Sequence, residues 1–516
     1  MSGLSSERGI TRTLWAVAIA LLVFVCAWPA LGGLMAVNDD IKFVRVPQHS
    51  EPLSKQVATA WRESPSFRPL ELAVAASCDE RTLRAPLAAP VQATGLVVLA
   101  FAIAALARIA LPGQPWVAPI ALAWVALSPA TTCAAWQIDA GSQTWSAALG
   151  AWALVLAWRA FESARAGRTP WLALGLLTLV FALGVNIKET FYGWSAGVGL
   201  ALIGACGWLL VRDRAAALRL SVTVLPVVAL PIAHLGLRWL TGSMSRSLEL
   251  KQENRYQLEL GMNLVTNAAQ SVAGAFGTGP FYLLADDKAN ALLRLLPMVA
   301  WLAELALLVT ALEFVVLRPA RERRLRWAPI ATMLGAGLVS LAVTFPMGSV
   351  SELYGFGANV AVGVLLAVAV TALWRMPPEE DRSITRGVAG TCAALLLSVG
   401  VYGLVGRAHH FHRVWTCTRM ANEQILQFMA KRPPAPRFDQ APLSAIYFPA
   451  CCRGERSYSS YIMPVAQAID IINTVEWMKR VDPKHPTTFS IDQDARNPTP
   501  YEMVVDCASM PPDSHW

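Results

Sequence analysis

Long apolar runs repeat along this chain, and they constrain its fold more than any other feature. A run of about 20 apolar residues can cross the hydrocarbon core of a bilayer as a helix. The pattern predicts about eleven transmembrane helices. The predicted spans are Leu14–Met35, Val91–Ala110, Trp116–Thr132, Thr144–Phe161, Trp171–Val185, Gly193–Val211, Leu220–Leu240, Leu292–Val316, Trp327–Phe345, Gly357–Trp374 and Gly387–Val405.

The composition agrees with a membrane protein. The chain is 55% hydrophobic and only 15% charged, whereas soluble domains carry about 25% charged residues. Its formal charge is +8, and many of its arginines lie in short loops between apolar runs. This placement is typical of cytoplasmic loops and does not suggest a nucleic-acid partner.

The same arginines predict the orientation of the chain. The arginine-rich connections are 159–168, 212–219, 318–326 and 375–386, whereas 133–143 and 347–356 contain no lysine or arginine. The positive-inside rule therefore places the N-terminus in the cytoplasm and the C-terminus outside. We expect an integral protein of a bacterial inner membrane, with its C-terminal part in the periplasm or another extracytoplasmic space.

This topology divides the chain into two domains. Residues 1–406 form an all-α polytopic membrane domain with two long outer loops, at about 36–90 and 241–291. Residues 407–516 are polar and proline-rich, and we expect a small extracytoplasmic α+β domain there. Its predicted elements are strands at 445–448 and 503–505 and a helix at 466–480.

Four polar motifs fall on the outer side of the predicted bundle. Carboxylates cost free energy inside a bilayer, so charged groups at a membrane rim are candidates for function. The motifs come from separate parts of the chain and can converge on one cavity. They are Asn38-Asp39-Asp40, Phe67-Arg68-Pro69-Leu70, Asn186-Ile187-Lys188-Glu189-Thr190 and Ser351-Glu352-Leu353-Tyr354.

Together, these motifs resemble those of the GT-C superfamily of membrane glycosyltransferases. The nearest pattern is that of protein O-mannosyltransferase-like and tetratricopeptide-containing (TMTC-like) members. These have an acidic pair after the first helix, an arginine-proline-leucine motif in the first loop, a lysine-glutamate pair and a late serine-glutamate-arginine-tyrosine motif. Here Leu353 stands where the family often has arginine, and the tail after 407 has no tetratricopeptide pattern. The resemblance covers about residues 14–405.

The resemblance implies a glycosyltransferase that uses a sugar on a polyprenyl phosphate. Asp39 or Asp40 would be the general base that deprotonates the acceptor hydroxyl. Arg68 and Lys188 would bind the leaving phosphate, arginine as a bidentate partner. The acceptor would be a cell-envelope glycan, a lipid or a protein. The remaining motif residues would support the site or line the sugar or acceptor pocket: Glu189, Glu352 and Tyr354.

Structural roles remain open for each motif. The acidic pair can be a solvated helix end, Lys188 and Glu189 a rim ion pair, and Arg68 a lipid-headgroup anchor. We predict no cofactor and no metal site, because the acidic pair alone is a poor metal site, although a divalent metal occurs in some GT-C enzymes. The alternative functions are a transporter or flippase of a lipid-linked substrate, and a polysaccharide polymerase.

Overall fold

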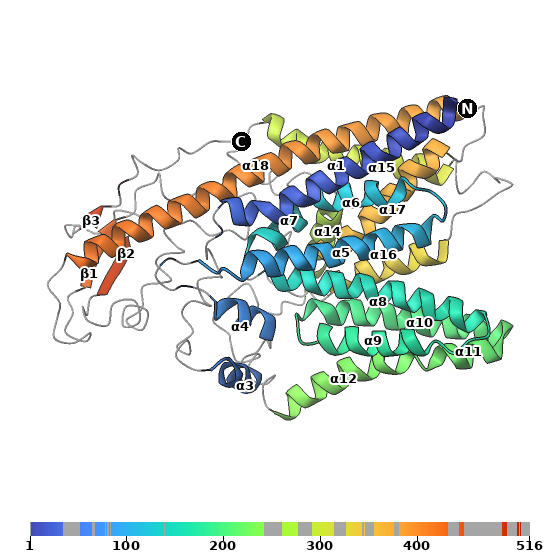
Figure 1. The fold of residues 1–516 in the computed structure, drawn as a ribbon, viewed down its shortest axis with the longest axis horizontal. Helices are drawn as coiled ribbons and strands as arrows, with labels where there is room; N and C mark the ends of the chain where they lie inside the picture. The colour runs from blue at the N-terminus through green and yellow to red at the C-terminus, as the bar shows by residue number, and fades with distance from the viewer. Residues whose placement is uncertain are drawn as a thin grey trace.

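The structure is a computed structural model that describes residues 2–32, 34, 52–63, 68–77, 79, 82, 84–138, 140–241, 261–276, 291–313, 327–342, 345, 355–375, 381–431, 443–447, 488–492, 503–504 and 506. This part of the chain is mostly helical (Figure 1). Its helices are α1 (Ser2–Gly32), α3 (Leu53–Glu63), α4 (Pro69–Ala75), α5 (Ala88–Ala110), α6 (Val117–Leu127), α7 (Pro129–Trp136), α8 (Gly141–Arg165), α9 (Trp171–Gly184), α10 (Thr190–Arg212), α11 (Arg214–Ser221), α12 (Val224–Leu240), α14 (Met262–Ala275), α15 (Ala291–Ala311), α16 (Trp327–Leu341), α17 (Phe356–Arg375) and α18 (Arg382–Ala430).

Every predicted span overlaps a described helix, but the helices differ in length. Within the described residues, six helical stretches are long and apolar enough to cross a membrane, or seven if the bent pair α6 and α7 counts as one span. Three further apolar helical stretches are shorter than this: Trp171–Gly184, Leu295–Ala311 and Pro329–Leu341. The described helices thus support an integral membrane protein, while the number of about eleven spans stays a prediction.

Helix α17 forms the centre of the bundle. It is buried along nearly its whole length and packs against α6, α15, α16 and α18. Its sequence is rich in alanine and valine. Lipid tails are as apolar as these side chains, so helices in a membrane associate through close packing, which small residues permit.

Helix α10 packs closely against α16 through two glycines one turn apart. A Cβ on Gly193 would lie 2.6 Å from the Cα of Ser340, and a Cβ on Gly197 would lie 2.5 Å from the Cα of Ala336. The two helix backbones are therefore in contact at these glycines, and any side chain there would push the helices apart. This contact fixes the position of α10 along most of its first two turns.

The predicted span 116–132 is broken. Helices α6 and α7 meet at Ser128 with a bend of 64°. The residue before a proline is pushed out of the helical region, and Ser128, which precedes Pro129, has an extended backbone. The guanidinium of Arg407 in α18 is fully buried, and its Nη2 donates to the carbonyl of Leu127 at 2.8 Å. This bond satisfies one carbonyl that the end of α6 leaves without a helical partner.

The two ends of the bundle differ in their polar residues. At one end, Arg375 at the close of α17 pairs with Glu7 of α1, donates to Gln114 and lies 4.7 Å over the ring of Trp116. Helices α3 and α4 lie at the opposite end from the N-terminus (Figure 1). The motifs that the sequence assigns to the outer side, where the structure describes them, also lie there. Which end faces the cytoplasm stays a prediction.

Helix α18 extends well beyond the bundle (Figure 1). It has 49 residues, about 74 Å at 1.5 Å per residue, whereas the hydrocarbon core is about 30 Å thick. It therefore continues as a helix through residue 406, where the sequence places the domain boundary. The division into two domains stays a prediction.

A small parallel sheet lies at the far end of α18 (Figure 1). Its strands are β1 (Leu443–Tyr447), β2 (Thr488–Asp492) and β3 (Met503–Val504), in the order β2-β1-β3. In register, Leu443 pairs with Thr488, and Ile446 pairs with Met503. β1 and β3 overlap the two predicted strands, and β2 was not predicted. The predicted helix at 466–480 lies outside the described residues.

Candidate functional site

Arg68 is placed by the proline that follows it. It precedes helix α4, whose first residue is Pro69, and it has a non-helical backbone with φ −135° and ψ 74°. Proline disfavours the helical conformation in the preceding residue and is well tolerated at the first position of a helix. Glu71 lies three residues after Arg68, in the first turn of α4. The two side chains can therefore reach each other.

Lys188 and Glu189 lie in the tight turn between α9 and α10. The carbonyls of both residues accept bonds from the first turn of α10: Phe191 N–H donates to Lys188 at 3.0 Å, and Tyr192 N–H donates to Glu189 at 3.0 Å. These backbone bonds tie the pair to the start of α10. The close contact of α10 with α16 thus also positions the two charged side chains.

The structure brings Arg68 and Lys188 into one chain of ion pairs. Arg68 Nη2 lies 2.8 Å from Glu189 Oε2, and Arg68 Nη1 lies 3.2 Å from Glu71 Oε2. The other oxygen of Glu71, Oε1, lies 3.6 Å from Lys188 Nζ. Glu71 thus bridges two cations that are 120 residues apart in the sequence. The order of the chain is Glu189, Arg68, Glu71, Lys188, with two cations and two carboxylates.

The two carboxylates have different surroundings. The side chain of Glu71 is 3% exposed and that of Lys188 is 6% exposed. The side chains of Arg68 and Glu189 are 27% and 39% exposed. One end of the ion chain is therefore inside the protein, and the other end reaches solvent.

Glu189 is held in its ionised form by its cationic neighbours. Partial burial raises its pKa, but the charge and hydrogen bonds of Arg68 and the charge of Lys188 outweigh this effect. The net result is a pKa for Glu189 below its ordinary value of 4.5. The carboxylate is therefore available to Arg68 at neutral pH, although water screens part of the attraction at this exposure.

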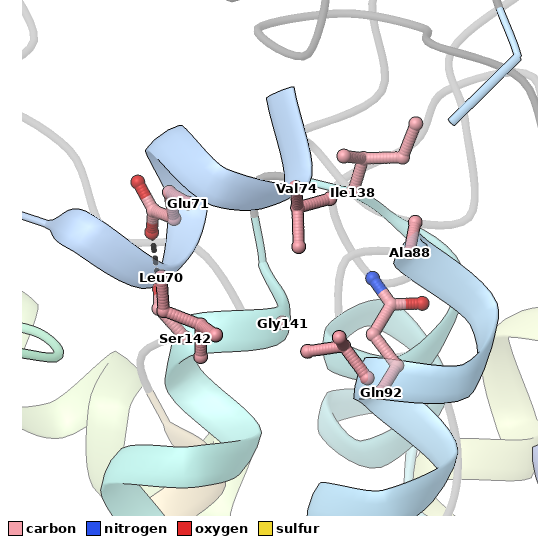
Figure 2. Close-up of a pocket in the computed structure, with 9 residues that line it drawn as sticks. Leu70, Glu71, Val74, Ala88, Gln92, Ile138, Gly141 and Ser142 are labelled. Carbon is pink, nitrogen blue, oxygen red and sulfur yellow. Dashed lines mark hydrogen bonds between the residues drawn. The ribbon is translucent and has the colours of Figure 1, made fainter. Parts of the chain in front are cut away.

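The buried carboxylate is fixed by helix α8. Ser142, in the first turn of α8, donates a hydrogen bond to Glu71 Oε1 (Figure 2). A small cavity of about 10 Å³ lies beside it, lined mainly by α4, α5 and α8. This is about the volume that holds one water molecule. A sugar or a phosphate does not fit in this cavity.

A line of buried hydroxyl and amide groups continues from the site into the bundle. Thr190 Oγ1 donates to Gln143 Oε1 at 2.9 Å and accepts from Ser146 Oγ at 3.0 Å. These bonds join the first turns of α8 and α10. They hold the turn with Lys188 against the helix with Ser142, which keeps the buried half of the ion chain together.

A second polar group lies next to Glu189. Tyr192 of α10 and His234 of α12 form a hydrogen bond of 2.5 Å between Oη and Nδ1. The ring of Trp61 from α3 packs edge-on against His234 at 5.4 Å. Arg238, one turn further along α12, is 4% exposed. These residues place an aromatic surface and a third cation, itself buried, at the same end of the bundle.

A larger cavity of about 370 Å³ lies where α1 ends against α18. Its lining includes Arg84, His412 and Arg419, with the ring of Trp415. His412 Nδ1 lies 3.3 Å from the carbonyl oxygen of Gly32, the last residue of α1. The volume is in the range of small-molecule sites. Asp39 and Asp40 follow α1 by only a few residues in the sequence.

Three of the seven predicted site residues lie in the described part of the chain: Arg68, Lys188 and Glu189. The structure brings these three together. Asp39, Asp40, Glu352 and Tyr354 lie outside the described residues, as does Phe67. Within the described residues, no group of three or more His, Cys, Asp or Glu side chains is placed to hold a metal ion.

Sequence reasoning missed Glu71 and Ser142. The first-loop motif ends at Leu70, one residue before Glu71. The available signal was the helical spacing, because a carboxylate three residues after an arginine at a helix start can pair with it. Nothing in the sequence pointed to Ser142, which reaches Glu71 only through the packing of α8 on α4.

Comparisons with known proteins found similar solved structures, whereas no protein-family model and no curated protein sequence matches the chain. One is the archaeal oligosaccharyltransferase AglB from Archaeoglobus fulgidus in complex with an inhibitory peptide and a dolichol-phosphate, at 12% identity and TM-score 0.45, over 89% of this chain and 64% of that chain. Another is ArnT from Cupriavidus metallidurans bound to undecaprenyl phosphate, at 14% identity and TM-score 0.44, over 93% of this chain and 86% of that chain.

A third is the apo form of the Archaeoglobus fulgidus oligosaccharyltransferase, at 12% identity and TM-score 0.42, over 85% of this chain and 62% of that chain. This chain thus spans less than two thirds of the length of the oligosaccharyltransferase. All three proteins are GT-C membrane glycosyltransferases, the superfamily that the sequence motifs resemble. With such identities and TM-scores, these likenesses carry no argument about activity, which must come from the residues of this chain.

Proposed function

We propose that the protein is a membrane glycosyltransferase that moves a sugar from a polyprenyl-phosphate carrier to an extracytoplasmic acceptor. The observation that carries this proposal is the single ion chain that contains both Arg68 and Lys188. The sequence motifs assign both residues to the leaving phosphate, and they come from distant parts of the chain. Their convergence at one end of the bundle is what a phosphate site requires.

The chemistry explains why cations are needed there. When the bond between the anomeric carbon and the phosphate oxygen breaks, the lipid phosphate leaves with one more negative charge than it had as a diester. Cations placed at this oxygen stabilise the transition state more than the ground state. Arg68 provides several donors in one plane, and Lys188 provides a compact charge.

The acceptor hydroxyl must lose a proton during the transfer. Asp39 or Asp40 would take this proton as general base. Glu352 and Tyr354 would line the sugar or acceptor pocket. The cavity of about 370 Å³ at the end of α1 supports this part of the proposal. Its lining has cationic and aromatic side chains and includes the last residues of α1, which come shortly before the acidic pair in the sequence. The acceptor would be a cell-envelope glycan, a lipid or a protein.

The test is a transfer assay in membranes with radiolabelled polyprenyl-phosphate sugars. We expect Arg68→Ala and Lys188→Ala each to lower kcat/KM by about 100-fold, the size of effect seen when one transition-state donor is removed. At least one of Asp39→Asn and Asp40→Asn should abolish transfer. Arg159→Ala is the matched control, because Arg159 also pairs with a glutamate, Glu162 at 3.6 Å, but near the far end of α8.

Full activity in both aspartate variants would contradict the assignment of the base. Transfer at the control rate in both Arg68→Ala and Lys188→Ala would contradict the phosphate site. Absence of transfer from every donor by folded wild-type protein would contradict the enzyme itself.

One observation favours the alternative of a transporter or flippase. Glu304 lies in the apolar helix α15 and is 2% exposed, and neither of its carboxyl oxygens has a hydrogen-bond partner among the described residues. Ionisable groups at membrane depth often serve substrate or proton pathways. If the protein is a flippase, Glu304→Gln should stop lipid translocation in proteoliposomes. If it is the proposed enzyme, this variant should keep its transfer activity.

A further inference from the structure

The ion chain has no net charge, which raises the question of how it accepts a phosphate. Arg68 and Lys188 are both paired with carboxylates. An anion that enters such a cluster meets two cations and two carboxylates. Net attraction requires that one carboxylate gives up its place beside the cations. Exposure and geometry decide which of the two this is.

Glu71 is the carboxylate that cannot move away. It is almost completely buried, and both of its oxygens are in use: Oε2 toward Arg68, and Oε1 toward Lys188 and Ser142. The cavity beside it has room for about one water molecule. Moving this carboxylate would also break its ion pair with the buried ammonium of Lys188, which is costly.

Glu189 is the carboxylate that can move away. Its side chain is 39% exposed, so water can solvate it once it leaves Arg68. It occupies the edge of the guanidinium formed by Nε and Nη2, at 3.0 and 2.8 Å from its Oε2. Arginine binds a phosphate through two parallel N–H bonds from one such edge. Glu189 thus covers an edge that a phosphate would use.

We infer that Glu71 is a positioning residue that keeps Arg68 and Lys188 together, whereas Glu189 is a built-in competitor that the donor phosphate displaces from Arg68. This inference rests on the proposed function. In the structure, Glu189 satisfies the exposed guanidinium edge. When the donor binds, its phosphate takes that edge, and the carboxylate of Glu189 turns to solvent or to the sugar.

The two carboxylates should have opposite effects on anion affinity when each is replaced by glutamine. Glu71→Gln and Glu189→Gln remove the same unit charge beside the same guanidinium. If only net charge mattered, both variants would bind an anion more tightly. Here Glu189→Gln should bind the anion more tightly and Glu71→Gln should bind it more weakly, because only Glu71→Gln removes the carboxylate that holds the two cations together.

The experiment measures the dissociation constant of undecaprenyl phosphate for the full-length protein in phosphatidylcholine nanodiscs, at fixed pH and ionic strength. We expect roughly three- to fivefold tighter binding by Glu189→Gln, the effect of removing a partly exposed ion-pair partner. We expect at least about tenfold weaker binding by Glu71→Gln, because a buried pair loses one partner. Glu162→Gln, from the exposed pair with Arg159, should bind as the wild type does.

Ser142→Ala provides a second route to the role of Glu71, in case Glu71→Gln does not fold. It removes the hydroxyl that holds Glu71 Oε1 and leaves every charge in place. Because the carboxylate is then less firmly held, we expect weaker binding of undecaprenyl phosphate. An unchanged dissociation constant would contradict the positioning role.

Two other results would overturn the inference while the proposed function stands. Tighter binding by both glutamine variants would mean that Glu71 is also a competitor. Weaker binding by both would mean that Glu189 is also a positioning residue. If the wild type binds no undecaprenyl phosphate and Arg68→Ala changes nothing, the proposed function fails and the inference falls with it. Inorganic phosphate in the same assay shows whether the headgroup alone is recognised.

Discussion

At the scale of single residues, one guanidinium serves two carboxylates with different exposure. Arg68 uses its Nε and Nη2 for Glu189 and its Nη1 for Glu71. A fork of this kind has a fixed shape, which an ammonium on a flexible stem does not reproduce. The identity of the residue at 68, and not only its charge, therefore matters for the site.

This argument predicts the outcome of a conservative substitution. Arg68→Lys keeps the charge, but an ammonium group has no planar edge with two parallel N–H bonds. It therefore cannot pair with Glu71 and at the same time bind a phosphate as the guanidinium does. We expect it to lower kcat/KM for transfer by about tenfold or more, the discrimination given by one good charge-assisted bond. Steady-state kinetics with a polyprenyl-phosphate sugar provide the measurement. A variant as active as the wild type would mean that Arg68 acts only as a point charge.

A second residue-scale prediction concerns pH. The pKa of Glu189 is below 4.5 in the folded protein, so its pairing with Arg68 is fully present above the ordinary glutamate pKa and is lost as the pH falls through the lowered value. The charged and titratable groups near it are Arg68, Lys188, Tyr192, His234 and Arg238.

The ratio of dissociation constants for undecaprenyl phosphate, wild type over Glu189→Gln, should therefore stay constant from about pH 7 to pH 5 and decrease toward 1 only below the ordinary glutamate range. The titration of the phosphate itself cancels in this ratio, because both proteins bind the same ligand. A ratio that changes near pH 6 would point to His234 in place of Glu189.

At the scale of helices, the site depends on how closely α10 packs. The turn with Lys188 and Glu189 leads directly into α10, and Gly193 and Gly197 set the distance of this helix from α16. A side chain at either glycine must push the helices apart, because the nearest atoms are backbone atoms. Displacement of α10 would then shift both charged residues relative to Arg68.

Two glycine variants in the same helix test this link. Gly197→Ala should lower the Tm of the purified protein and weaken donor binding, since its Cβ would lie 2.5 Å from the Cα of Ala336. Gly204→Ala has nothing within 4 Å of the new Cβ and should be neutral or stabilising by about 0.5–1 kcal/mol, because alanine favours helix over glycine. Equal Tm values in the two variants would contradict the role of the contact.

The sequence predicts part of this helical arrangement and not the rest. Hydropathy located each apolar segment, because the bilayer requires about 20 apolar residues per span. It did not separate α6 from α7, since both halves are apolar and only Ser128-Pro129 marks the bend. It also ended the last span at Val405, because the polar residues of the outer part of α18 carry no membrane signal but are compatible with a helix.

The candidate site was predicted to a similar extent. The motifs identified Arg68 and Lys188 and placed them on one side of the membrane, because charge at a membrane rim stands out in a sequence. The buried partner that joins them did not stand out. Glu71 is one acidic residue in a polar loop of the sequence, and its importance comes from burial against α8, which is a tertiary effect.

At the scale of the whole molecule, the arginine pattern predicts how the protein sits in the membrane. Some of the described arginines of the predicted inner loops also lie over tryptophan rings near the helix ends; the guanidinium of Arg212 lies 4.2 Å over the ring of Trp208, and that of Arg375 lies 4.7 Å over the ring of Trp116. Such pairs are typical of residues that anchor a helix at a membrane interface. The two ends of the bundle therefore differ in both charge and chemistry.

This orientation can be measured with reporter fusions. Alkaline phosphatase should be active when it is fused after Trp516, and inactive when the fusion point is Arg168, because the first position is predicted outside and the second in the cytoplasm. A green fluorescent protein fusion should show the reverse pattern. Reversed signals at both positions would place the ion chain on the cytoplasmic side, where the proposed extracytoplasmic acceptor is absent.

The long helix α18 also determines the direction of the β-sheet relative to the helix bundle. Its outer part holds the chain next to β3, because the side chain of Gln424 exchanges two hydrogen bonds with the backbone of Asp506 at 3.0 and 2.8 Å. Each residue of an α-helix advances about 1.5 Å and turns about 100° around the axis. The number of residues in the helix therefore sets both the distance of the sheet from the bundle and its direction around the helix axis. One residue inserted between Val405 and Gln424 would rotate the sheet by about 100° around the helix axis and move it only about 1.5 Å along that axis. Insertion of a full turn would move the sheet about 5.4 Å along the axis and nearly restore its direction.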